Sequence, residues 1–148
     1  MNDYGRRIVI DLGFEAAVAH TAKAIREEGL EVASRIDVRD CFWREFRHGF
    51  RQYVLLDVWS PKLAIEALKH DLAAGTVLRT TFAVYELADG ETAIVAKEPL
   101  SSVSSDPGWR RDAPALASSA DRLCDRIAGV LARLQHPESH LATGTPIV

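Results

Sequence analysis

The chain has 148 residues, of which 47% are hydrophobic and 26% are charged, and its net charge is −3. These values are typical of one globular domain with a substantial core, and they exclude disordered and fibrous proteins. The slightly acidic charge provides no overall positive field that would attract nucleic acid or anionic lipid. No stretch approaches the roughly 20 apolar residues that a membrane-spanning helix needs, and the N-terminus lacks the apolar core of a secretory signal.

Several kinds of functional motif are absent from the sequence. Cys41 and Cys124 lie far apart and form no C-x-x-C pair, which argues against a disulfide framework or zinc ribbon and favours the cytoplasm. There is no G-x-G-x-x-G, no P-loop and no G-x-S-x-G, so the usual nucleotide loops and serine elbow are missing. His136 and His140 have metal-like spacing but lie in a proline-containing tail without a nearby cysteine. We therefore expect neither a cofactor nor a metal.

The first unit in chain order is predicted as strand, helix, strand. Residues 6–12 alternate between apolar and polar side chains, as a half-buried strand does. From Phe14 the apolar residues recur at helical spacing, and Gly29 followed by Leu30 is typical of a left-handed helix cap. Residues 30–38 alternate again, with Val32, Ser34 and Ile36 on one side and Ala33, Arg35 and Asp37 on the other.

The second unit is predicted as strand, helix and hairpin. Residues 53–59 form an apolar strand, and Ser60-Pro61 starts a helix, because serine caps free N–H groups and proline needs no partner at the first helical position. Asp89-Gly90 predicts a tight turn between strands 76–87 and 92–97. The expected buried stripe of the helix is Ile65, Leu68 and Leu72, with Ala64 and Ala67.

The last part of the chain is predicted as a polar loop at 99–111 and a helix that opens near 112–114. We predict one domain over residues 1–134 and a flexible tail at 135–148. The order β-α-β-β-α-β-β-α, with a short helix after the second strand, predicts an α+β fold of two layers. In this fold, helices cover one face of a curved, antiparallel or mixed five-stranded sheet. The apolar face of the last helix comprises Leu116, Ala120, Leu123, Ile127, Leu131 and Leu134.

A series of short motifs resembles the family called domain of unknown function 302. In order, they are Gly29, Ile36-Asp37-Val38, Phe50, Tyr53, Ser60-Pro61 and residues 82–86 (FAVYE) before Asp89-Gly90. The resemblance implies a fold similar to the TATA-box-binding-protein-like class and a homodimer. It implies no reaction, because the family's activity is not established.

The chain departs from this family at two positions where its relatives carry cysteine. In place of Cys-Asn-Pro it has Trp59-Ser60-Pro61, and in place of Leu-Pro-Cys-Asn it has Leu78-Arg79-Thr80-Thr81. This chain therefore lacks the thiols at those positions that any metal or redox chemistry of the family's cysteines would require.

Residues 41–53 (CFWREFRHGFRQY) contain five of the eleven aromatic residues, interleaved with three arginines. Such a stretch can stack on single-stranded nucleic acid or dock on a membrane surface. However, Phe42, Phe46, Phe50 and Tyr53 follow helical spacing. This pattern favours an amphipathic helix packed on the sheet, with Trp43 as its most exposed member.

The sheet face opposite the helices is the candidate site. If Val54, Leu56 and Val58 point toward the helices, the alternate side chains of that strand lie on the uncovered face. Aromatic and charged groups there can form a ligand platform or a homodimer interface, and we favour the dimer, with Trp59 at or near the interface. The candidate ligand-binding or interface residues are Tyr53, Asp57, Trp59, Arg79, Thr81 and Tyr85, with Arg7, Asp11, Arg35 and Asp37 on the first two strands.

Asp57 is a carboxylate in an otherwise apolar strand and therefore needs a partner. We expect a bidentate ion pair with Arg79, which would make Asp57 structural. The alternative is an enzyme acting on a small metabolite, with Asp57 as acid/base and Arg79 as anion clamp. The sequence thus predicts a cytoplasmic, homodimeric module that binds a small ligand or a partner. Catalysis is left open, no membrane contact is expected, and nucleic acid is disfavoured by the acidic charge.

Overall fold

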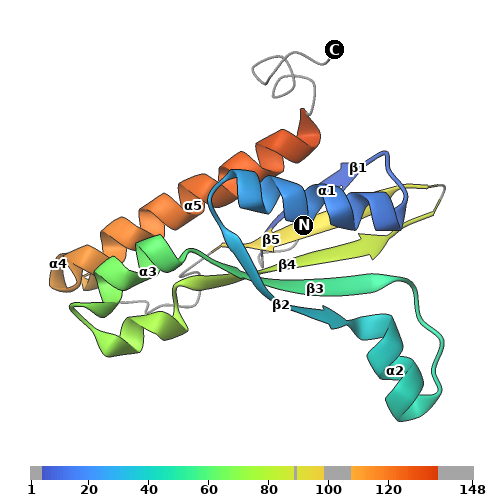
Figure 1. Ribbon diagram of the computed structural model, residues 1–148, viewed down its shortest axis with the longest axis horizontal. Coiled ribbons are helices and arrows are strands. Elements are labelled where there is room, and N and C mark those ends of the chain that lie inside the picture. Colours follow the sequence, from blue (N-terminus) through green and yellow to red (C-terminus); the bar gives the residue numbers. More distant parts are fainter. Residues whose placement is uncertain (1–4, 89, 99–107, 137–148) are drawn as a thin grey trace.

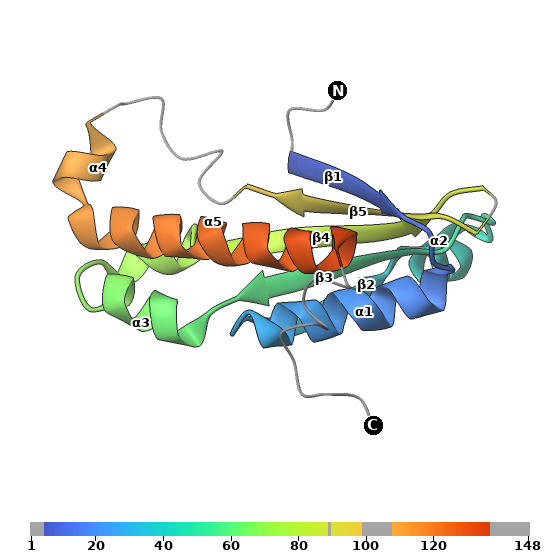
Figure 2. The same ribbon diagram turned by 90° about the horizontal axis from the view of Figure 1, so that it is seen from above.

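The computed structural model describes residues 5–88, 90–98 and 108–136. Within these ranges the chain forms two layers, an open five-stranded sheet and two long helices across one of its faces (Figures 1 and 2). The predicted α+β class is confirmed. Asp89 of the predicted turn, residues 99–107 of the predicted loop and residues 137–148 of the predicted tail lie outside the described residues.

The sheet is antiparallel throughout, with the strand order β1-β5-β4-β3-β2. The first strand of the chain pairs with the last, so that Ile8 lies opposite Ile94. Strands β4 and β5 form the predicted hairpin, and Gly90 in the turn has a φ of 77°. The strands are β1 Gly5–Ile10, β2 Glu31–Asp37, β3 Tyr53–Trp59, β4 Arg79–Glu86 and β5 Thr92–Lys97.

The two longest helices, α1 and α5, lie side by side on the same face of the sheet in both views (Figures 1 and 2). Helix α5 begins at Pro114, within the predicted start, and ends one residue beyond the predicted domain boundary. No helix in the described part of the chain is both long and apolar enough to cross a membrane. The helices are α1 Phe14–Glu27, α2 Val38–Phe46, α3 Pro61–Leu68, the 3-10 helix η1 Leu72–Thr76, α4 Trp109–Asp112 and α5 Pro114–Gln135.

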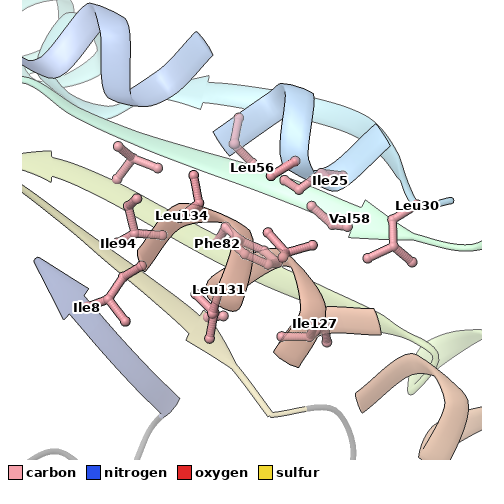
Figure 3. Close-up of a cluster of buried hydrophobic side chains, with 14 of the residues drawn as sticks. Ile8, Ile25, Leu30, Leu56, Val58, Phe82, Ile94, Ile127, Leu131 and Leu134 are labelled. Carbon is pink, nitrogen blue, oxygen red and sulfur yellow. The ribbon is translucent and has the colours of Figure 1, made fainter. Parts of the chain in front are cut away.

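The main core lies between these two helices and the sheet (Figure 3). Phe82 on the central strand is fully buried, beside Ile25 of α1 and Leu131 of α5. Each such side chain contributes about 1.5–3 kcal/mol when it is fully removed from water. The core residues labelled in Figure 3 are Ile8, Ile25, Leu30, Leu56, Val58, Phe82, Ile94, Ile127, Leu131 and Leu134.

Helix α1 ends in the predicted left-handed cap. Gly29 has a φ of 77°, and its N–H donates to the carbonyl of Arg26 at 2.9 Å. The N–H of Leu30 donates to the carbonyl of Ile25 at 3.0 Å, and the Leu30 side chain is buried in the core. These two bonds satisfy carbonyls that the helix end would otherwise leave free. The turn also directs the chain into β2.

Helix α3 starts as predicted but buries a different stripe. Ser60 Oγ accepts a hydrogen bond from the Leu63 N–H at 3.2 Å, and Pro61 is the first helical residue. The expected burial of Ile65 and Leu72 is wrong, because Ile65 is exposed and Leu72 is 87% exposed. The helix ends at Leu68, so Leu72 no longer continues its periodicity. The residues that α3 does bury are Leu63, Ala64 and Ala67, and a second small core joins the two alanines to Ala74 and Leu78.

Charged side chains join the C-terminal end of α1 to α5. Arg133 donates from Nε to Glu28 Oε1 and from Nη1 to Glu27 Oε2, both at 2.8 Å. The hydrogen bond to Glu28 raises the pKa of Arg133 further. Arg126 Nη1 donates to the Glu28 carbonyl at 2.7 Å. A Cβ at Gly129 would lie 2.5 Å from the Glu28 carboxyl carbon, so the missing side chain makes room for this group.

Candidate functional site

The six candidate residues lie on the sheet face that α1 and α5 leave open (Figures 1 and 2). The register places Tyr53 opposite Tyr85, Asp57 opposite Thr81, and Trp59 opposite Arg79. Paired residues of an antiparallel ladder share a face, and Val54, Leu56 and Val58 between them are buried on the helix side. Their expected placement on one surface is therefore observed. Their role in binding stays a prediction.

Tyr53 and Tyr85 form a parallel stack, with ring centroids 5.1 Å apart and planes inclined by 8°. Partial burial, and then the neighbouring Tyr85, raises the pKa of Tyr53, so its phenol stays protonated at neutral pH. Arg7 on β1 donates from Nε to the Tyr85 hydroxyl at 3.2 Å. The stack joins β3 to β4, and the hydrogen bond from Arg7 extends the contact to the edge strand β1.

Asp57 and Arg79 form the predicted ion pair. Arg79 Nε donates to Asp57 Oδ1 at 3.2 Å, and Arg79 Nη2 donates to Asp57 Oδ2. The side chain of Asp57 is 21% exposed and that of Arg79 is 56% exposed. Arg79 is therefore the more exposed partner of the pair. One guanidinium already engages both carboxylate oxygens.

Trp59 lies at the end of β3 that is remote from the tyrosine stack. Its ring is partly buried against the second core, which contains Ala64, Ala67 and Leu78. Its partial burial is therefore explained within one chain, and whether it also touches a second copy stays a prediction.

Strand β2 contains an irregularity that the sequence pattern did not reveal. The register shifts between Val32 and Ser34, so that Arg35 lies opposite Leu56 and Asp37 opposite Val54. The expected placement of Arg35 and Asp37 on the open face is wrong, because an extra residue in one strand reverses the alternation that follows it. Both line a small cavity of about 100 Å³ beside Phe14 of α1. Asp11 was also expected on the open face, but it follows the end of β1.

The shift places an apolar strip across the open face. Ile36 lies opposite Leu55, Leu55 opposite Ala83, and Ala83 opposite Val95. We call these four residues the apolar strip. Ile36 is 50% exposed, and the other three are partly buried. Ile36 was not among the predicted site residues, and only the bulge in β2 brings it to this surface.

Residues 38–52, called the arm from here on, lie between the end of β2 and the start of β3 and extend from the sheet on the side away from α1 and α5 (Figures 1 and 2). Helix α2 in the arm has no buried residue. Phe46 is 72% exposed and Trp43 is 53% exposed. The expectation that this helix packs on the sheet core is wrong. Trp43 is exposed as expected, but Phe46, not Trp43, is the most exposed member. The helix ends at Phe46, so the aromatic residues after it no longer follow one helical face.

Local contacts hold the arm together. Asp37 Oδ1 accepts the Asp40 N–H at 2.9 Å and so caps α2, and Arg44 Nε donates to Asp40 Oδ2 at 2.9 Å. At the other end Arg47 adopts a left-handed conformation and lies 5.7 Å from the centre of the Trp43 ring. Such exposed contacts each contribute less than about 1 kcal/mol.

An aromatic chain links the arm to the open face. Phe42 contacts Phe46 and, edge to face, Phe50, with ring centroids 6.4 and 5.1 Å apart. Phe50 lies 6.3 Å from Tyr53, which stacks on Tyr85. Contacts between aromatic rings, some exposed and some partly buried, therefore run from α2 onto the sheet.

The model of the family described as domain of unknown function DUF302 matches residues 7–134. The chain belongs to this family. The crystal structure of an uncharacterized conserved DUF302 protein from Bacillus stearothermophilus is similar to the chain, with a TM-score of 0.73. The two share 21% sequence identity, and the similarity covers 90% of this chain and 99% of the other. No curated protein matches the chain.

The cysteines of this DUF302 chain are both free and partly buried. Burial, followed by the nearby Glu98 and Asp121 carboxylates, raises the pKa of the Cys124 thiol. Cys41 Sγ accepts a hydrogen bond from Arg44 Nη2 at 3.3 Å on the arm. Neither thiol lies among the six candidate residues.

The histidines do not gather at a metal site in the described part of this DUF302 chain, where no three His, Cys, Asp or Glu side chains are grouped to hold an ion. His136 caps α5, and its predicted partner His140 lies outside the described residues. His20 and His136 line a cavity of about 550 Å³ with Asp11 and Arg133. That cavity contains none of the six candidate residues.

Proposed function

We propose that the chain is a binding module whose partner is a second copy of itself, joined through the open sheet face. The observation that carries this proposal is the apolar strip, in which Ile36 is 50% exposed, on the same face as the aromatic chain that leads to the arm. An apolar surface of this kind rarely remains uncovered on a soluble monomer.

The composition of the face supports a protein interface. Its aromatic residues and arginines are the types that most often anchor protein contacts. Arg7 and the Asp57–Arg79 pair flank the apolar strip, which gives the arrangement of an apolar centre with a polar rim.

The size of the face is compatible with a dimer. Five strands about 4.8 Å apart and about 23 Å long cover roughly 550 Å² per copy, or roughly 1,100 Å² in total. Specific interfaces bury about 1,200–2,000 Å², so the sheet alone lies just below this range.

The enzymatic alternative has less support. A catalytic carboxylate needs an oxygen free to approach its substrate, whereas both oxygens of Asp57 accept from Arg79. The cavities lined by Asp11, by Phe14 and by Lys62 do not include Asp57. A structural role for the ion pair follows more directly from this geometry.

We also propose the cytoplasm as the location of the protein, and this is supported by its two free cysteines. The acidic net charge supports a protein partner rather than nucleic acid or an anionic membrane. A small ligand shared between two copies would be bound at the same open face.

Sedimentation equilibrium of the purified chain tests the dimer. The expected mass is twice 16.3 kDa at micromolar concentration. Ile36→Arg places a charge in the apolar strip and should give a folded monomer, since Ile36 is already half exposed. Leu72→Arg is the matched control, because Leu72 is also apolar and exposed but lies in η1 away from the strip. A wild-type monomer, or equal effects of the two substitutions, would overturn the proposal.

A further inference from the structure

The arm carries large apolar side chains that the described part of the chain leaves uncovered. Helix α2 has nine residues and no buried side chain. Helices shorter than about 12–15 residues are marginal in water unless an apolar face packs against something. The exposed rings of Trp43 and Phe46 form such a face, and the described part of the chain leaves it uncovered.

The position of the arm indicates what covers it. Figures 1 and 2 show α2 on the open side of the sheet, between the end of β2 and the start of β3. A second copy seated on the open face would therefore meet the arm. The contacts from Phe42 through Phe50 to Tyr53 already link the arm to the sheet.

Charge favours one arrangement of the two arms. Residues 38–52 contain four arginines and two acidic residues, a net charge of +2. Two arms side by side would therefore repel each other, whereas arms at opposite ends of the paired sheets are kept apart. The arms should therefore lie at opposite ends of the paired sheets.

We propose that the two copies exchange arms, an inference that rests on the proposed dimer. The arm of each copy lies over the open face of the other, at the end that carries Trp59 and Arg79. The two-fold axis then runs across the strands, and Trp43 and Phe46 are covered by the partner.

The added contact brings the interface into the range of stable dimers. A nine-residue helix is about 13.5 Å long and about 10 Å wide, so it covers roughly 135 Å². The partner surfaces beneath the arms are already part of the sheet contact, so the two arms add roughly 270 Å² of their own surface, for a total near 1,400 Å². The arm thus supplies the area that the sheet alone lacks.

The first test compares dissociation constants measured by sedimentation. Trp43→Ser with Phe46→Ser should raise the dimer Kd at least tenfold. Ile65→Ser with Leu72→Ser is the matched control, since it removes two exposed apolar side chains outside the arm and should leave the Kd unchanged. An unchanged Kd in the arm variant, while Ile36→Arg is monomeric, would overturn arm exchange and leave the sheet dimer standing. A monomeric wild-type chain would overturn both.

The second test measures whether the partner covers Trp43 and whether the two arms lie at opposite ends of the dimer. With Trp59→Phe and Trp109→Phe, Trp43 is the one remaining tryptophan, and acrylamide should quench it less in the dimer than in the Ile36→Arg monomer. Spin labels at His48→Cys, with Cys41→Ser and Cys124→Ser, should be farther apart than the sheet length of about 23 Å. Equal quenching in the two states, or a shorter label distance, would overturn the proposed exchange.

Discussion

The ring of Tyr53 lies face to face with the ring of Tyr85 on the neighbouring strand, with centroids 5.1 Å apart. The pair occupies directly opposite positions of β3 and β4, where cross-strand side chains interact most strongly. It joins the arm to the sheet, because Phe50 contacts Tyr53 and Arg7 contacts Tyr85. The two tyrosines therefore link the arm to the open face.

The contribution of the tyrosine pair to the free energy of unfolding should come from the stacked rings rather than from the hydroxyl of Tyr85. Tyr53→Ala removes the stack and a partly buried ring, and should lower the free energy of unfolding by about 2 kcal/mol. Tyr85→Phe keeps the stack and removes only the exposed hydrogen bond from Arg7. It should lower the free energy of unfolding by about 0.5 kcal/mol. Urea denaturation of the two variants measures both values. Equal losses would contradict the dominance of stacking.

Substitution of Arg79 should lower the free energy of unfolding more than substitution of its ion-pair partner Asp57. Arg79→Gln leaves the more buried carboxylate of Asp57 without its countercharge, whereas Asp57→Asn leaves an arginine that is already exposed. We expect Asp57→Asn to lower the free energy of unfolding by no more than about 1 kcal/mol, and Arg79→Gln to lower it by more. Thermal melts of Ile36→Arg monomers carrying each change provide the comparison. A rise in stability for Asp57→Asn would instead favour a strained, catalytic carboxylate.

Gly29→Ala should destabilise the turn between α1 and β2. The residue has a φ of 77°, and an added Cβ would lie 2.8 Å from Arg126 Nη1. We expect a loss of about 1 kcal/mol from the backbone conformation alone. Gly49→Ala is the control, because a Cβ there meets nothing within 4 Å. Denaturation midpoints for the two variants test the difference, and a Gly29→Ala variant as stable as Gly49→Ala would contradict it.

Cys124 should react slowly with thiol reagents in the folded protein. The reactive species is the thiolate, and a raised pKa lowers its fraction at pH 8. Alkylation by iodoacetamide, followed by peptide mass mapping, should be slower at Cys124 than in glutathione, and the rate should rise as the pH passes the ordinary thiol pKa. The same residue in urea-unfolded protein should react at the ordinary thiol rate. Fast alkylation of the folded protein at pH 8 would show that the thiol is not shielded.

The sheet and its main helices could be predicted from the sequence because their signals are local. Ser60-Pro61 and Gly29 begin or end elements through hydrogen bonds to residues within five positions. Strand β3 alternates without interruption, so the open-face positions of Asp57 and Trp59 followed directly from the period of two.

The errors have a different physical origin, since they depend on contacts that the local pattern does not contain. The bulge in β2 reverses the side-chain alternation, which moved Ile36 onto the open face and Arg35 off it. The helical spacing of Phe42 and Phe46 does indicate a face that needs covering. This spacing cannot indicate whether the surface that covers the face belongs to the same chain. In the described part of the chain, no residue of α2 is buried.

The pairing of β1 has a consequence for folding, because the residues of its ladder partner β5 lie 82 to 92 positions further along the chain. During synthesis, β1 cannot pair until Lys97 has left the ribosome, whereas the β4–β5 hairpin can close within a few residues. Until then, the backbone groups of β1 that pair with β5 have no ladder partner and are available to any extended segment nearby. The order of synthesis thus makes β1 the strand that completes the sheet late, and a delay in its docking would leave the nascent chain open to aggregation at that strand.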